Sequence, residues 1–322
     1  MKALIRNRYG GPDVLQVREI EAPVARDGEV LVRVHAASIN DWDWGLLHGP
    51  TLPISLGPPR VNILGSDIAG RVVQVGKDVR DLCVGDEVYG DLSRFGPGGW
   101  GGLAEYVCAR ERALALKPAG MTFEQAAALP QAGQLAVQGL SAGGPPRAGL
   151  TLLINGGGGG VGTLGVQLAK AQRMEVTGVD RASKHAMMRN IGFDHVIDYE
   201  SEDFTRNGRR YDLILDTKTE HSPFRYRRSL TPQGTYVSLG GPKIGKLLAI
   251  AAYGWCRRVA PGQSFRLIAL TQNRDLAYLN QCFDAGQLIP VIDGPYRLHE
   301  APEALRRFGA GNHTGKVVIR LM

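Results

Sequence analysis

Hydrophobic and polar positions follow different patterns in the first third of the chain and in the rest. In the first third, short runs rich in β-branched residues, such as 30–34 and 69–75, are bounded by glycine, which is typical of strands joined by tight turns. No helical period persists before residue 121, so we expect an irregular β-barrel-like domain there. Between residues 123 and 140 apolar residues recur at helical spacing, which predicts a helix.

From residue 150 onward, predicted strands and helices alternate. Five short apolar runs predict strands, at residues 151–155, 175–179, 195–197, 213–215 and 236–239. Stretches 161–172 and 184–191 predict helices between the first three of them. Alternation at this pitch indicates an α/β fold with a doubly wound parallel sheet of the Rossmann type. After about residue 265 the pattern is mixed and ends in a predicted strand at 316–319, which we expect to rejoin the first domain.

The length of 322 residues fits two domains. We predict a catalytic domain formed by residues 1–122 and 266–322, and a dinucleotide-binding domain formed by residues 123–265. Hydrophobic residues make up 43% and charged residues 21% of the chain, which is typical of a globular protein. The 43 glycines argue against a helical bundle and for many tight turns.

Charge and apolar runs limit the partners that we expect. The net charge of +7 favours anionic small ligands, but no Lys/Arg run is long enough for a nucleic-acid arm, so we expect no dedicated nucleic-acid partner. The longest apolar run, 247–256, is half of the ~20 residues that a bilayer span needs. The start of the chain lacks a signal-peptide pattern. We therefore expect a cytoplasmic protein without a membrane partner.

A glycine-rich loop gives the clearest chemical signal. Gly157, Gly159 and Gly162 fit the pattern G-x-G-x-x-G, with a predicted strand before them and a predicted helix after them. In a dinucleotide-binding fold, the first glycine allows a sharp turn, the second lets the pyrophosphate approach and the third lets the helix pack closely. The amides of Gly160 and Val161 at the helix start suit phosphate oxygens. A flexible glycine-rich turn is the alternative.

The end of the second strand of this domain carries two opposing signals about the cofactor. Asp180 lies 23 residues after Gly157, where an acidic residue binds the ribose 2′-hydroxyl of NAD(H). Arg181 and Lys184 follow, and both suit the 2′-phosphate of NADP(H). We predict NADP(H), with NAD(H) possible; a solvated helix start is the alternative for the two basic residues.

Seven motifs, taken in chain order, resemble those of the medium-chain dehydrogenases/reductases, in the zinc-independent quinone oxidoreductase-like branch. They lie at residues 36–43, 64–70, 84–88, 102–106, 159–162, 196–199 and 315–318. The resemblance spans essentially the whole chain. It implies a GroES-like catalytic domain and a Rossmann domain with the active site in the cleft between them, and hydride transfer from NADPH to a quinone or an α,β-unsaturated carbonyl. It also implies a homodimer.

The resemblance adds cofactor contacts to the glycine loop. Tyr199 and Lys184 resemble the contacts to the adenosine phosphate, and the Gly240-Gly241 turn and Lys316 resemble further cofactor-side positions. Tyr199 as a core aromatic and Lys316 as a solvated charge at a strand edge are the alternatives.

The positions that hold catalytic zinc in the alcohol dehydrogenases of this superfamily lack zinc ligands here. They read Asn40-Asp41 and Gly65-Ser66-Asp67, without a thiolate or an imidazole. We therefore expect no metal. Asn40 is the candidate donor to a developing oxyanion, and Asp43 is the candidate to orient Asn40 or a ribose hydroxyl.

One departure from the family pattern bears on activity, because Leu135 stands where relatives tend to carry a threonine near the nicotinamide. Two alternatives to the quinone or enone reductase therefore remain. One is a zinc-free alcohol dehydrogenase or enoyl reductase. The other is a weakly catalytic NADPH-binding interaction protein.

Overall fold

The computed structural model describes residues 1–49, 59, 62–93, 100–257 and 261–322. The chain forms two compact units. Unit 1 comprises Met1–Ala132, Gln272–Asp284 and Ile292–Met322, and unit 2 comprises Gly133–Thr271 and Ala285–Val291. The two boundaries, after Ala132 and Thr271, lie ten and six residues later than those of the predicted domains. The helix α2 (Phe123–Ala127) packs on strands of unit 1, which places the first boundary inside the next helix.

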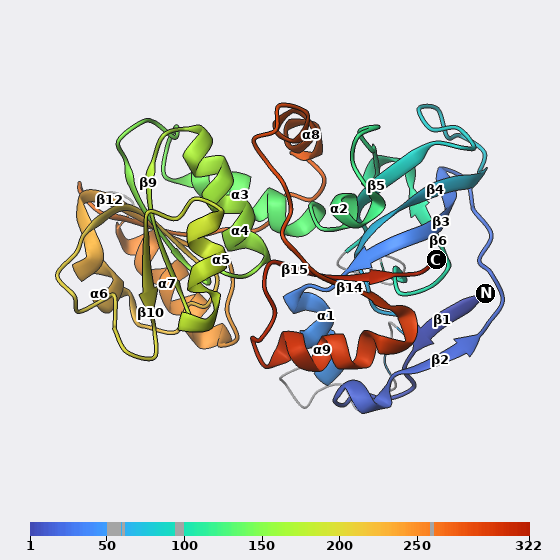
Figure 1. Ribbon diagram of the computed structural model, residues 1–322, viewed down its shortest axis with the longest axis horizontal. Coiled ribbons are helices and arrows are strands. Elements are labelled where there is room, and N and C mark those ends of the chain that lie inside the picture. Colours follow the sequence, from blue (N-terminus) through green and yellow to red (C-terminus); the bar gives the residue numbers. More distant parts are fainter. Residues whose placement is uncertain (50–58, 60–61, 94–99, 258–260) are drawn as a thin grey trace. The chain divides into compact units, whose positions relative to one another are not determined.

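The core of unit 1 is built around a seven-stranded sheet (Figure 1). Its strands run in the order β14-β15-β3-β4-β5-β7, and β6 also pairs with β3. Their bounds are β3 Glu29–Ser38, β4 Asp67–Val75, β5 Glu87–Asp91, β6 Tyr106–Arg110, β7 Ala115–Leu116, β14 Ile292–Arg297 and β15 Lys316–Arg320. Alternate residues of β3, such as Val30, Val32 and Val34, are buried, as the period of a strand requires. The predicted return of the last strand to the first domain is confirmed, because β15 pairs with β3.

Unit 1 also contains a strand pair and helices. A separate antiparallel pair consists of β1 Lys2–Ile5 and β2 Gln16–Glu19. The helices are α1 Asp41–His48, α2, α8 Leu276–Asp284 and α9 Ala301–Gly309. The helix α1 lies in the part of the chain in which no helical period was recognised. This two-turn helix is too short to show a helical period, and Asp43 at its third position satisfies the backbone amide at its start.

Unit 2 is a six-stranded parallel sheet in the order β10-β9-β8-β11-β12-β13. The bounds are β8 Thr151–Asn155, β9 Glu175–Asp180, β10 His195–Asp198, β11 Tyr211–Asp216, β12 Leu230–Ser238 and β13 Ser264–Leu267. The strand order reverses at β8, which has β9 on one side and β11 on the other. In such sheets ligands bind at the carboxyl ends of the strands beside this switch point. The predicted doubly wound α/β fold is confirmed.

The helices of this part of the chain are α3 Pro130–Ala142, α4 Gly160–Ala171, α5 His185–Asn190, α6 Pro223–Tyr226 and α7 Ile244–Arg257. The single helix predicted over 123–140 is two helices, because Pro130 has no amide hydrogen to continue α2 and instead begins α3. Five 3₁₀ turns complete the structure, at Pro12–Val14, Glu111–Ala113, Ala182–Lys184, Arg227–Ser229 and Leu298–Glu300. Among the described residues, no helix has the length and apolar character that a bilayer crossing requires.

Candidate active site

The glycine loop of unit 2 joins the carboxyl end of β8 to the start of α4. Gly156 has a φ of +89°, so the sharp turn occurs there and not at Gly157, where it was predicted. A Cβ on Gly162 would lie 2.5 Å from backbone atoms of Gly156 and Gly157. The predicted close packing of the helix start on the loop is therefore confirmed, and at this position only glycine fits.

The start of α4 presents backbone amides that the helix itself does not satisfy. Gly159 is the N-cap and, as a glycine, has no side chain that could cap the helix. The first intrahelical hydrogen bond is donated by the amide of Thr163 to the carbonyl of Gly159. The amides of Gly160, Val161 and Gly162 precede that bond and lack carbonyl partners one turn earlier. A helix N-terminus of this kind, without side chains in the preceding loop, fits a diphosphate.

Asp180, at the end of β9, fixes the glycine loop. One carboxylate oxygen accepts the amide of Gly158 at 2.9 Å, and the other accepts the amide of Arg181 at 2.9 Å and lies 3.3 Å from the ammonium of Lys184. Lys184 is itself buried, and desolvation lowers its pKa although Asp180 opposes the shift. The alternative of a solvated helix start is therefore wrong for Lys184. Both Asp180 oxygens have protein partners.

Arg181 and Tyr199 form the exposed basic edge of this site. The Arg181 Nε donates to the Tyr199 hydroxyl at 2.6 Å and lies 3.4 Å from Glu200. Tyr199 follows β10 directly, and β10 pairs in register with β9, so the two side chains come from adjacent strand ends. Tyr199 is 49% exposed and is not a core aromatic. An exposed guanidinium beside a phenol hydroxyl suits a phosphate monoester.

A third loop, which the sequence analysis missed, closes the strand ends. Asp216 ends β11, and one of its carboxylate oxygens accepts the amides of Lys218 and Thr219 at 2.8 and 2.9 Å. The Thr219 hydroxyl donates to the carbonyl of Gly240 at 2.6 Å, which ties this loop to the predicted Gly240-Gly241 turn. The acidic residue directly after the apolar run 213–215 was the signal that could have identified this loop.

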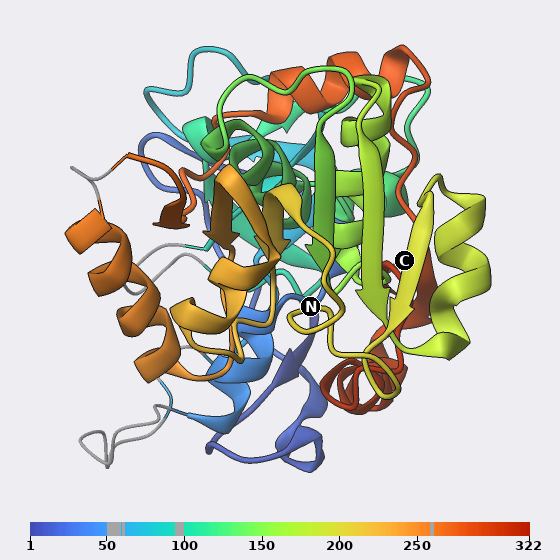
Figure 2. The same ribbon diagram turned by 90° about the vertical axis from the view of Figure 1, so that its left-hand side faces the viewer.

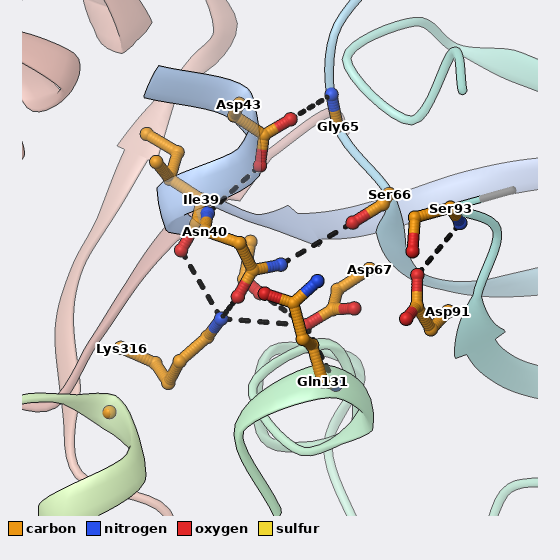
Figure 3. Close-up of polar contacts among 12 residues, drawn as sticks. Ile39, Asn40, Asp43, Gly65, Ser66, Asp67, Asp91, Ser93, Gln131 and Lys316 are labelled. Atoms are coloured by element: carbon orange, nitrogen blue, oxygen red, sulfur yellow. Dashed lines mark hydrogen bonds and ion pairs between the residues drawn. The ribbon is translucent and has the colours of Figure 1, made fainter. Parts of the chain in front are cut away.

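In unit 1, Asn40 and Asp43 lie at the start of α1. One Asp43 oxygen accepts the amide of Asn40 at 2.8 Å, and the other accepts the amide of Gly65 at 2.7 Å (Figure 3). Asp43 is fully buried, and this desolvation raises its pKa to about 7 against the effect of the two backbone bonds. Asp43 therefore orients Asn40, one of its two predicted roles, and does so through the backbone.

Lys316 contacts the side chain of Asn40. The residue is 4% exposed, so the alternative of a solvated strand-edge charge is wrong. Its ammonium donates to the Asn40 Oδ1, to the Ile39 carbonyl at 3.2 Å and to an Asp67 oxygen at 3.4 Å (Figure 3). Because the amide oxygen of Asn40 faces a cation, the amide nitrogen is directed away from Lys316. That nitrogen lies 3.4 Å from the Ser66 hydroxyl, a weak hydrogen bond.

Two buried carboxyl groups lie next to this contact. Asp67 and Asp91 are direct partners across β4 and β5, so their side chains share one face of the sheet. Desolvation raises the pKa of both, that of Asp91 to about 7 with the charge of Asp67 as a further cause. Within the described residues, Asp67 Oδ1, Asp91 Oδ2 and the Gln131 Nε2 are buried without a hydrogen-bond partner. This cluster therefore contains buried hydrogen-bonding atoms that no described protein group satisfies.

The two tryptophans of α1 differ. Trp44 packs on His48 in a tilted arrangement with ring centroids 4.2 Å apart, contacts Gly309 of α9 and lies partly buried against the core of unit 1. Trp42 is 49% exposed and is the candidate of the two to stack on a flat ligand. Over residues 1–49, 59, 62–93, 100–257 and 261–322, no group of three or more His, Cys, Asp or Glu side chains is arranged to hold a metal ion.

Comparisons with known proteins agree with this architecture. A family model described as "Alcohol dehydrogenase GroES-like domain" matches residues 26–119, and one described as "Zinc-binding dehydrogenase" matches residues 191–319. The chain is 33% identical to a 2-methylene-furan-3-one reductase of Solanum lycopersicum, over 99% of this chain and 79% of that protein. The same values hold for an NADPH-dependent alkenal/one oxidoreductase of Arabidopsis thaliana. A quinone oxidoreductase structure from Coxiella burnetii is 29% identical, with a TM-score of 0.84 and coverage of 100% of this chain and 99% of that one.

The fold and the comparisons first define a class, the oxidoreductases in which a GroES-like domain is combined with a Rossmann-like domain. Within that class, the chain belongs to the medium-chain dehydrogenase/reductase superfamily, in its quinone oxidoreductase and alkenal/one oxidoreductase branch.

Proposed function

We propose that this protein is an NADPH-dependent reductase that transfers hydride to a quinone or an α,β-unsaturated carbonyl without a metal ion. The observation that carries the proposal is the state of Asn40, whose amide oxygen faces the Lys316 ammonium and whose amide nitrogen points away from that cation and donates a weak 3.4 Å bond to the Ser66 hydroxyl. An acceptor of this kind is already electrophilic, and it develops negative charge on its oxygen as it is reduced. A fixed, neutral donor is suited to stabilise that charge.

In unit 2, bound NADPH would supply the hydride. The residues that fit the cofactor are the amides at the start of α4 for the diphosphate and the Arg181–Tyr199 pair for the 2′-phosphate. Asp180 supports NADPH over NADH, because it is buried and both of its oxygens already accept protein hydrogen bonds, which disfavours its use by a ribose 2′-hydroxyl. Gly157, Gly159 and the Gly240-Gly241 turn complete the proposed lining.

In unit 1, Lys316 is reassigned from a cofactor contact to a positioning residue. It fixes which end of the Asn40 amide is a donor, and its charge is balanced by Asp67. Asp43 holds the backbone of Asn40 in place. The cluster thus binds and orients the acceptor oxygen, a task for which the zinc-dependent members of the superfamily use a metal.

A steady-state assay tests the proposal. We expect oxidation of NADPH with quinones or enones, slower reaction with NADH, and no oxidation of simple alcohols. Turnover of alcohols instead would favour the zinc-free alcohol dehydrogenase. Tight NADPH binding without turnover of any acceptor would favour the interaction protein.

A further inference from the structure

The solvent-facing side of α7 in unit 2 contains no polar residue. We define the α7 face as the exposed residues of this helix between 244 and 256, which are Ile244, Gly245, Leu248, Ala249, Ala251, Ala252, Trp255 and Cys256. Its three largest side chains are mostly exposed to solvent, Ile244 by 69%, Leu248 by 63% and Trp255 by 72%. A surface helix normally places charged or polar residues on this side. An unbroken apolar face on the solvent side departs from this pattern, and a surface that it could bury against would stabilise it.

The other side of the same helix provides the packing that unit 2 needs. Ile250 and Gly254 are buried, and a Cβ on Gly254 would lie 2.2 Å from the carbonyl oxygen of Phe265 on β13. Tyr253 packs edge-on against Phe265 at 4.9 Å. The α7 face is therefore additional to the core of unit 2, and exposed Phe224 of α6, which contacts Tyr253 at 5.4 Å, extends the apolar surface beside it. Figure 2 shows α7 in orange at the left-hand side.

The chain around this face has an unusual charge distribution. The 54 residues from 221 to 274 contain nine basic and no acidic residues. The basic residues are Arg225, Arg227, Arg228, Lys243, Lys246, Arg257, Arg258, Arg266 and Arg274. The segment alone therefore carries +9, more than the +7 of the whole chain, and the remaining residues together carry −2. Lys243 directly precedes α7, and Arg227, Arg228 and Arg266 are exposed.

We propose that the α7 face docks on the surface of an anionic lipid bilayer. An apolar helix face with tryptophan and leucine, on a helix that follows Lys243, ends at Arg257 and contains no acidic residue, combines the two forces that hold a helix at a bilayer interface. The apolar side chains enter the boundary of the acyl chains, and the basic residues attract the anionic headgroups. Docking is peripheral, which agrees with the lack of a spanning helix among the described residues.

A second copy of this chain is the competing occupant, and two observations oppose it. A two-fold contact through α7 would bring two helices together that each follow Lys243, end at Arg257 and contain no acidic residue to balance these charges. The α7 face is also small, because 14 residues of helix are about 21 Å long and cover roughly 200 Å² at a width of about 10 Å. Stable interfaces bury about 800 Å² on each partner.

This proposal departs from the sequence-based expectation of no membrane partner, which considered only the length of the apolar run 247–256. The structure changes the argument, because that run lies on a helix whose apolar residues face both the core of unit 2 and the solvent. The α7 face shares no residue with the glycine loop or with the Asn40 cluster. Its test therefore does not depend on the proposed reductase activity.

Co-sedimentation of the full chain with vesicles tests the proposal. We expect binding to phosphatidylcholine vesicles that contain phosphatidylglycerol, and little binding to phosphatidylcholine alone or at high salt. The double variant Leu248→Ser/Trp255→Ser should lower the partition coefficient by about tenfold or more, since each buried large apolar side chain is worth about 1.5–3 kcal/mol. Leu116→Ser, a change of the same kind at a 55% exposed position of unit 1, is the matched control and should leave binding unchanged.

A second pair of variants tests the contribution of charge to vesicle binding. Lys243→Glu should lower the partition coefficient by about tenfold or more, since each basic residue near the bilayer contributes about 1 kcal/mol. Lys77→Glu makes the same charge change at an exposed site of unit 1 and should have little effect. Equal losses in both variants, or equal binding to neutral and anionic vesicles, would overturn the proposal. So would a solution dimer that Leu248→Ser/Trp255→Ser dissociates.

Discussion

At the scale of single residues, the proposed chemistry depends on the side-chain amide of Asn40, whose orientation is fixed by the buried ammonium of Lys316. Lys316 and Asn40 are 276 positions apart in the chain, and they meet because β15 pairs with β3, whose end leads into α1. Asp67 balances the charge of Lys316. Removal of Lys316 should therefore affect both the orientation of Asn40 and the stability of unit 1, and the two effects can be separated.

Lys316→Met should lower kcat by about 10–100-fold, with a smaller change in the KM for NADPH, because the Asn40 amide loses the partner that orients it. It should also destabilise the fold by roughly 3–5 kcal/mol, because the buried Asp67 carboxyl loses its cationic partner. The double variant Lys316→Met/Asp67→Asn should recover much of the stability but not kcat. Recovery of kcat together with stability would show that Lys316 has only a structural role.

Cofactor choice is also decided by single residues. Arg181→Ala should raise the KM for NADPH by about 10–100-fold and leave that for NADH nearly unchanged, since only NADPH carries the phosphate that this guanidinium would bind. Arg189→Ala, an exposed arginine on α5, is the control. Lys184→Ala should weaken both cofactors, because Lys184 supports Asp180 under the glycine loop. Equal effects of Arg181→Ala on the two cofactors would contradict the preference for NADPH.

The buried carboxyl groups give unit 1 a characteristic dependence on pH. Burial raises the pKa of Asp91 from 3.8 to about 7, so the folded state holds this proton over a range in which the unfolded state has lost it. The contribution of Asp91 to stability is therefore greatest below pH 4, falls as the pH rises to about 7, and is constant above that.

Asp91→Asn keeps the shape of the neutral carboxyl and should remove this dependence. The difference in unfolding free energy between the variant and the unmodified protein should therefore shift in favour of the variant by roughly 1–4 kcal/mol as the pH rises from 4 to 7. Urea denaturation at both pH values measures the change, with the surface variant Asp27→Asn as the control. If the unfolding free energies of Asp91→Asn and of the unmodified protein differ by the same amount at both pH values, Asp91 is ionised in the folded state throughout this range.

At the scale of elements, the glycine loop and α4 form one packed unit. Gly162→Ala places a Cβ 2.5 Å from the backbone of Gly156 and Gly157, atoms that cannot move without opening the turn. We expect a loss of stability of about 1–3 kcal/mol and weaker binding of both cofactors. Gly245→Ala in α7 makes the same change where no atom lies within 4 Å, and it should stabilise the protein by about 0.5–1 kcal/mol. Unchanged cofactor affinity in Gly162→Ala, measured by fluorescence titration, would contradict the placement of the site.

The elements also show what a sequence pattern can and cannot predict. The buried parallel strands β8 and β11 were predicted because each is a continuous apolar run between turns. The helix α1 was missed because its eight residues Asp41–His48 carry two aspartates and a glycine and have little amphipathic period. The strand β13 was missed because it is a four-residue edge strand whose last two residues are exposed.

The candidate site was predictable only where its signal is local in the chain. The glycine loop and the residues at the end of β9 follow from spacing within one fold unit, whereas Tyr199 after β10 came from the family resemblance. The contact of Lys316 with Asn40 and Asp67 depends on the pairing of strands that are distant in the chain, and no local pattern carries that information. For the same reason the sequence could not distinguish Lys316 as a cofactor contact from Lys316 as a buried partner of Asn40.

At the scale of the whole molecule, the central claim is that the chain reduces its acceptor with residues of its own and without a bound metal. The Lys316 ammonium contacts Asn40 and Asp67, in the segments that the family resemblance matches to zinc-ligand positions of other members. Chelator treatment should therefore leave the fold and the activity unchanged. Elemental analysis of the purified protein should find no stoichiometric zinc.

The most direct measurement is a single-turnover experiment that follows oxidation of NADPH by chelator-treated protein, with a quinone or an enone as the acceptor. The account predicts that NADPH is oxidised at the same rate before and after chelation, and that Asn40→Ala slows this step by about 10²–10³-fold. Turnover that requires added zinc, or an Asn40→Ala variant as fast as the unmodified protein, would contradict it.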